Sequence, residues 1–76
     1  MNAERRKKLE EINGKILDLT QELEDLEGEE QEAFDNLPES LQGSEKGEAM
    51  QSAIDAICSA KDGLGDAEGS INEAMS

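Results

Sequence analysis

The chain has 76 residues, with 20 Asp and Glu against 7 Lys and Arg, and a net charge of −13. This length accommodates one small domain, and the absence of His excludes an imidazole base, a His metal ligand and a Ser–His or Cys–His pair. A single Cys cannot close a disulfide within the chain, and no segment has the apolar run of a membrane span or a secretory signal, so we expect a protein of the reducing cytoplasm.

Residues 3–36 are predicted to form the first helix. Apolar residues recur there at alternating spacings of three and four, which is the heptad pattern of a coiled coil. Position a of the heptad holds Leu9, Ile16, Leu23, Glu30 and Leu37, and position d holds Ile12, Leu19, Leu26 and Ala33. We expect positions a and d to face a second helix, with Leu17 and Phe34 beside this stripe.

Residues 37–44 are predicted to form a turn. Pro38 cannot continue a helical hydrogen-bond ladder and disfavours the α conformation at Leu37. Gly43 and Ser44 mark the end of the turn, where Ser44 is expected to cap the next helix. We expect Leu37 and Leu41 to fold back over the end of the core, and the short reversal to make the two helices antiparallel.

Residues 45–74 are predicted to form the second helix. One column of large residues recurs every seven positions, a column of alanines has the same period, and Ile54 adds to the large residues. The large column is Met50, Ile57, Leu64 and Ile71, and the small one is Ala53, Ala60, Ala67 and Ala74. Small residues let two backbones approach closely. Three glycines weaken the end of this helix, so the part after Lys61 is expected to be frayed or to depend on packing.

A reversal centred on residues 40–41 sets the expected register of the two helices. It places Leu26 level with residues 54–57, Leu19 with residues 61–64 and Ile12 with residues 67–71. Polar residues at the interface, Glu30 and Lys61, are expected to fix this register. Cys58 is expected to be a small buried residue in the apolar half of the helix.

The predicted fold is therefore all-α, a single antiparallel helical hairpin over residues 1–76. Two helices cannot enclose a core, so we expect a homodimeric four-helix bundle or a higher oligomer. Candidates for the second interface are Leu17, Phe34, Met50 and Ala56. The expected core and oligomer residues are Leu9, Ile12, Ile16, Leu19, Leu23, Leu26, Phe34, Leu37, Met50, Ile54, Ile57, Leu64 and Ile71.

Charge is segregated along the chain. Residues 1–15 hold five bases and three acids, for a net charge of +2, whereas residues 16–76 hold two bases and 17 acids, for a net charge of −15. The basic cluster consists of Arg5, Arg6, Lys7 and Lys8. The acidic run consists of Glu22, Glu24, Asp25, Glu27, Glu29, Glu30 and Glu32.

The basic cluster has two interpretations. A helix dipole disfavours cations at the N-terminus of a helix, so something must offset it. The cluster pairs with Glu68, Glu73 and the terminal carboxylate at the end of the second helix, within one chain or between subunits, or it binds an anion such as a small nucleotide. Direct DNA binding is not expected, because a net charge of −13 repels a polyanion.

The acidic run also has two interpretations. It is the solvated face of a coiled coil, or it imitates the phosphate charge of DNA, because its linear charge density approaches that of a duplex. No sequence motif for a metal, a cofactor or a phosphate loop is present, and a di-metal helical bundle would need Glu-x-x-His. We expect neither a metal nor a cofactor.

The stretch EEQEAFDNLPESLQGSEKGEAMQSAIDAI, residues 29–57, resembles small acidic helical-hairpin proteins of phages and prophages. The specific part of the resemblance is the turn from Asp35 to Glu48. The resemblance implies an accessory protein of a virus or mobile element in the cytoplasm of a bacterial host. Proteins of this kind often block host defence by binding a defence protein or its nucleotide signal. Gly63, Gly65 and Gly69 depart from the pattern of that group.

These observations together predict a non-catalytic binding protein, not an enzyme. We expect it to inhibit a host protein by direct binding, through the acidic run or a surface near the turn. Sequestration of a small anionic nucleotide by the basic cluster is the alternative, and mimicry of DNA by the acidic run is a further one. The expected partners are a second copy of the chain and a host protein.

Added salt should raise the melting temperature. Both helices are acidic and repel each other, and dissolved ions screen this repulsion. Thermal unfolding followed by circular dichroism should show a higher midpoint at about 300 mM than at about 10 mM NaCl. An unchanged midpoint would contradict the prediction.

Overall fold

All 76 residues are described by a computed structural model, which contains three helices and no strand. α1 spans Ala3–Asp35, α2 spans Glu39–Gln42 and α3 spans Glu45–Met75. The predicted all-α class is confirmed. Helix α3 continues through the three glycines after Lys61, and the segment expected to be a plain turn contains the short helix α2.

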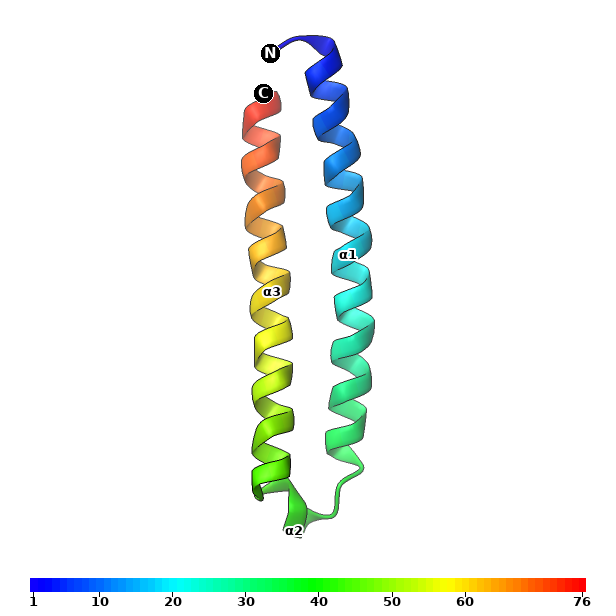
Figure 1. Ribbon diagram of the computed structural model, residues 1–76, viewed down its shortest axis with the longest axis vertical. Helices are drawn as coiled ribbons and strands as arrows, with labels where there is room; N and C mark the ends of the chain where they lie inside the picture. The colour runs from blue at the N-terminus through cyan, green and yellow to red at the C-terminus, as the bar shows by residue number, and fades with distance from the viewer.

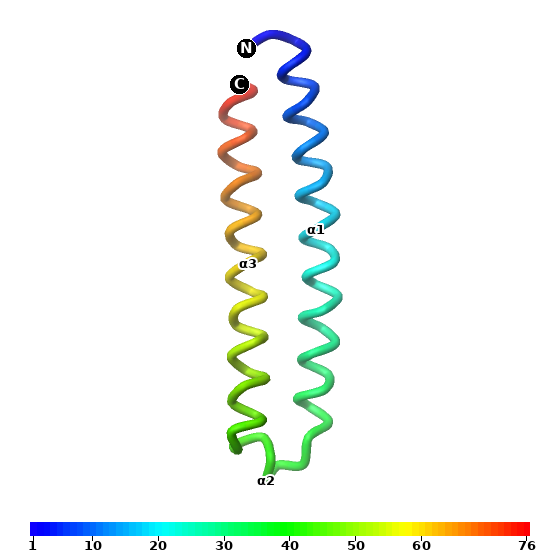
Figure 2. The backbone as a smooth tube through the Cα atoms, viewed as in Figure 1, coloured from blue at the N-terminus to red at the C-terminus, as the bar shows by residue number.

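The two long helices lie side by side and run in opposite directions (Figure 1). The chain reverses direction at α2, so both termini lie at the same end of the molecule (Figure 2). The resulting rod measures 58 × 15 × 12 Å, close to the length of one 33-residue helix.

Polar side chains cap both long helices at their N-termini. The side chain of Asn2 accepts a hydrogen bond of 2.8 Å from the backbone N–H of Arg5 at the start of α1. The hydroxyl of Ser44 accepts one of 3.5 Å from the N–H of Gly47 at the start of α3, so the predicted cap is confirmed. Each cap satisfies one of the N–H groups that the first turn of a helix leaves free.

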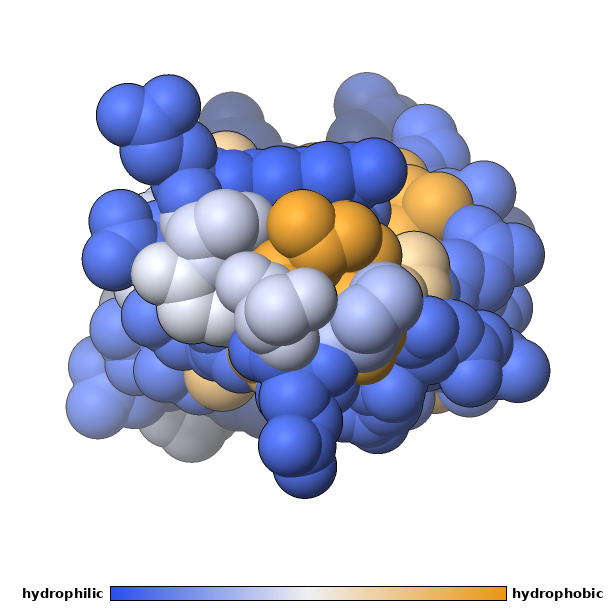
Figure 3. Space-filling model, turned by 90° about the horizontal axis from the view of Figure 1, so that it is seen from below, coloured by the Kyte–Doolittle hydropathy of each residue, from blue (hydrophilic) through white to orange (hydrophobic).

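The turn is closed by Gln42, whose role the sequence did not reveal. Its side-chain amide donates to the carbonyl oxygens of Phe34 and Leu37, at 3.4 and 3.2 Å, and thereby satisfies one acceptor in the last turn of α1 and one just beyond it. Leu37 is half-buried as expected. Leu41 is 42% exposed instead of covering the core, because α2 turns it outwards, and apolar surface is open at this end of the rod (Figure 3).

The hairpin core lies along positions a and e, not along the predicted positions a and d. On α3, position a is the column of large residues that begins at Met50 and position d is the column of alanines. Position e follows d and is Asn13, Thr20, Glu27 and Phe34 on α1 and Ile54, Lys61, Glu68 and Met75 on α3. Only Ile16 and Ile54 among the large apolar residues are buried, at 8% and 9% exposure. On α1 the covered positions form the series Leu9, Asn13, Ile16, Thr20, Leu23, Glu27, Glu30, Phe34 and Leu37, with Gln31 beside them. On α3 they are Gly47, Met50, Ile54, Ile57, Lys61, Leu64, Glu68, Ile71 and Met75, with Ala67 beside them.

Contacts at position e explain this choice of face. Phe34 and Ile54 are large residues at e, and the ammonium of Lys61 contacts the carboxylate of Glu27, both also at e. Burying them rotates each helix by about 50° from an a/d stripe. The expected register is therefore wrong: Ile12, Leu19 and Leu26 remain about half exposed instead of being buried against α3, and Glu27 lies level with Lys61.

Gly47 is required by the contact between α2 and α3. A Cβ atom at this position would collide with the backbone carbonyl of Gln42. Gly28 has open space around it and lies on the outer side of α1.

Replacement of the two glycines should have opposite effects. Gly47→Ala should lower the free energy of unfolding by about 1–3 kcal/mol, because a rigid backbone must move aside. Gly28→Ala should raise it by up to about 1 kcal/mol, because alanine favours a helix interior. Urea unfolding measures both, and equal effects of the two substitutions would contradict the packing at Gly47.

Candidate functional site

An apolar face runs along the rod. We define it by position d of the two long helices: Ile12, Leu19, Leu26 and Ala33 on α1, and Ala53, Ala60, Ala67 and Ala74 on α3. Ile12, Leu19 and Leu26 are 42%, 49% and 52% exposed. Apolar residues so regularly placed and so open to water mark an interaction surface.

Both halves of the apolar face lie on the same side of the hairpin. On each helix, position d lies about 80° from the centre of the a/e stripe, counted against the chain direction. The helices face each other and run in opposite directions, so this rotation turns both d columns to one side. The hydrogen bond of 2.9 Å between Asn13 and Asn72 lies along the other side.

The residues expected at a second interface are distributed over three surfaces. Phe34 and Met50 are half-buried in the hairpin core, and Ala56 is exposed at the edge of the apolar face. Leu17 is 53% exposed, at position b on the opposite side of the hairpin. Cys58 shares position b and is exposed, which corrects the expectation of a buried thiol: the core follows a and e, and b falls outside it.

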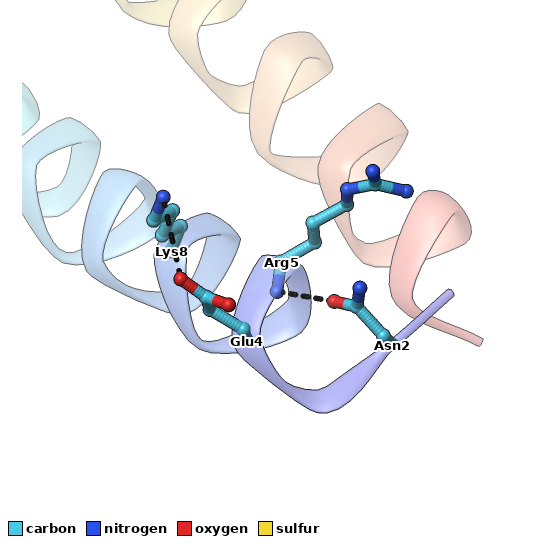
Figure 4. Close-up of polar contacts among 4 residues, drawn as sticks. All are labelled: Asn2, Glu4, Arg5 and Lys8. Carbon is cyan, nitrogen blue, oxygen red and sulfur yellow. Dashed lines mark hydrogen bonds and ion pairs between the residues drawn. The ribbon is translucent and has the colours of Figure 1, made fainter.

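The basic cluster projects beyond the end of α3. Asn13 contacts Asn72, so Met75, three residues further along α3, lies about level with Glu10. Consequently the expected ion pairs with Glu68 and Glu73 are not formed within the chain. Lys8 instead contacts Glu4 on its own helix at 3.8 Å, while Arg5 extends towards the last turns of α3 (Figure 4).

The four cations do not converge on one point. Arg5, Arg6, Lys7 and Lys8 are consecutive in α1, and each residue of a helix is turned by about 100° from the last. Their side chains therefore leave the helix in four directions. In a single chain the cations surround α1 on every side, and they form no common pocket in which an anion could bind.

The acidic run divides between two surfaces. Glu27 and Glu30 are half-buried against α3. The other five carboxylates are exposed, and four of them form an outer acidic row at helical spacings of three and four, away from α3. This row consists of Glu22, Asp25, Glu29 and Glu32.

Lys61 is the one cation drawn into the core. Its Nζ lies 3.0 Å from Oε1 of Glu27, and both side chains are largely covered. The hydrogen bond to Glu27 raises the pKa of Lys61 above its usual value of 10.5, partial burial opposes this, and the charges of Glu27 and Glu24 add to it. The sequence pattern placed Lys61 at the interface but did not identify Glu27 as its partner. The two residues meet only because position e of α1 faces position e of α3.

The structure contains no pocket and no cluster of three Cys, Asp or Glu side chains placed to hold a metal ion. None of the helices combines the length and apolar character that crossing a bilayer requires. No protein-family model, curated protein or solved structure matches the chain. The apolar face, the basic cluster and the outer acidic row are therefore the candidate functional surfaces.

The Lys61–Glu27 contact should make stability fall at alkaline pH. A pKa that is higher in the folded chain contributes stability that is fully present below 10.5 and is lost as the pH rises through the raised value. Urea unfolding at about pH 8 and about pH 11.5 should show this loss. It should shrink in Lys61→Met but persist in Lys46→Met, which removes an exposed cation. An equal loss in the two variants would contradict the role of Lys61.

Proposed function

We propose that this chain is a non-catalytic binding protein that acts as a homo-oligomer. The observation that carries the proposal is the apolar face. Two large apolar residues are buried inside the hairpin, whereas three of the apolar face remain about half exposed. An isolated helix pair is marginally stable, and covering this face in a four-helix bundle is the usual remedy.

The proposed partner of the assembled protein is a host protein, bound directly and thereby inhibited. The resemblance to phage helical hairpins supports this, and so does the outer acidic row. Its four exposed carboxylates lie on α1 away from α3 and remain at the edge or outside of a bundle built on the apolar face. Such a row suits a partner with a basic surface, including a protein that normally binds DNA. The proposed location is the cytoplasm of the bacterial host.

Sequestration of a small anionic nucleotide is the second candidate. The observation in its favour is that Arg5, Arg6 and Lys7 have no ion-pair partner, beside the free N–H groups that begin α1. The divergence of these side chains counts against a site within one chain. A site of this kind would need the clusters of two chains.

Affinity capture from bacterial lysate separates the candidates. The acid variant Asp25→Asn/Glu29→Gln/Glu32→Gln should lose the captured host protein, whereas the base variant Arg5→Ala/Arg6→Ala/Lys7→Ala should retain it. Mass spectrometry identifies the retained proteins and any released small molecule. Competition of the captured protein by duplex DNA would point to mimicry of DNA by the acidic row.

The opposite pattern would contradict the proposal. Sequestration would be established instead if a nucleotide is released from the wild-type protein and is absent from the base variant, while the acid variant captures the host protein as well as the wild-type protein does.

A further inference from the structure

The large and small residues of the apolar face lie at matching heights along the rod. The contacts of Asn13 with Asn72 and of Glu27 with Lys61 fix which residues of α1 and α3 are level. Counted from them, each large residue of α1 has an alanine of α3 beside it to within about 3 Å. The level pairs are Ile12 with Ala74, Leu19 with Ala67, Leu26 with Ala60 and Ala33 with Ala53.

The α3 half of this face is small along its whole length. Position g, next to d on this side, also carries only Ala, Gly or Ser. Together the two positions hold Ala49, Ala53, Ala56, Ala60, Gly63, Ala67, Ser70 and Ala74, of which only Ala67 is half-buried and the rest are exposed. We call this shallow strip the furrow, and the column of Ile12, Leu19 and Leu26 the ridge.

We propose that the apolar face binds a second copy of the chain about a two-fold axis parallel to the helices, with the ridge of each copy in the furrow of the other. A half-turn about such an axis exchanges the two helices without changing any height. Leu19 then meets Ala67 of the second copy, and Leu26 meets Ala60 of the second copy. Large side chains opposite small ones fill the space between helices at close approach.

The reversed arrangement fits these residues less well. A two-fold axis across the helices would place ridge on ridge and furrow on furrow, so that large residues collide at one edge while small ones leave a gap at the other. It would also stack α1 on α1, with the two acidic rows along one edge. In the proposed arrangement each acidic row runs beside the uncharged g positions of the other copy's α3.

The area left uncovered matches one such partner. A compact folded protein of 8.2 kDa exposes about 4,500 Å². This chain exposes 5417 Å², about 900 Å² more. A stable protein interface buries about 800 Å² on each partner, so one second copy accounts for the excess.

Cysteine cross-linking tests the orientation, which rests on the proposed self-association through the same face. Cys58 is first replaced with Ser, and single cysteines are then introduced as Leu26→Cys and Ala60→Cys. Oxidation of a mixture of the two should give a mixed disulfide dimer, because opposed positions bring the Cβ atoms within disulfide range. Neither variant should cross-link to itself, because identical helices lie diagonally across the bundle.

Cross-links between two α1 helices would overturn the orientation. These would form with Leu19→Cys alone or in a mixture of Leu19→Cys and Leu26→Cys. Failure of Leu26→Cys to cross-link with Ala60→Cys would overturn it equally.

Sedimentation separates failure of the orientation from failure of the proposed function. The wild-type chain should sediment at twice its mass of 8.2 kDa, and Leu19→Lys should weaken the dimer at least about tenfold. Leu17→Lys places the same charge on the opposite side and should leave the dimer intact. A wild-type monomer would refute self-association itself, whereas a dimer with α1–α1 cross-links would refute only the proposed axis.

Discussion

The structure depends on a limit of geometry: two helices can bury only one stripe of each other. On α1 from Leu9 onwards, position d is apolar throughout, position a is apolar except at Glu30, and position e adds the large apolar residue Phe34. The hairpin takes a and e, because Phe34, Ile54 and the pair of Lys61 with Glu27 lie at e. The d column of Ile12, Leu19 and Leu26 is left in water. The apolar face is exposed because the hairpin buries positions a and e in its core instead of position d.

The limit of one buried stripe on each helix also determines where the charges lie. Lys61 brings a cation into the core opposite Glu27, where it holds the two helices in register, and the remaining acids other than Glu30 and Glu68 are exposed. The basic cluster extends beyond α3, so the molecule is an acidic rod with a cationic tip at the end where both chain termini lie. Neither the Lys61–Glu27 contact nor the basic cluster belongs to the apolar face, and the α3 half of this face carries no charged residue.

Local features of the fold were predictable from sequence, whereas the rotation of the helices was not. Pro38, Ser44 and the apolar periods place the turn and the cap, because these depend on neighbouring residues alone. The selection between an a/d and an a/e stripe is a rotation of about 50°, and it depends on which residues meet across the hairpin. The candidate surfaces divide in the same way. The basic cluster and the acidic run could be identified from the sequence, whereas the exposure of Leu19 and Cys58 could not, because it depends on the rotation of the helices.

The most direct test of whether the apolar face must be covered is the dependence of thermal stability on protein concentration. Unfolding of a dimer is coupled to dissociation, so the melting temperature should rise between about 1 and about 100 µM protein. The variant Leu19→Lys should melt at a lower temperature across this range. A melting temperature of the wild-type chain that is independent of concentration, with full helicity as a monomer, would contradict the need for a second copy.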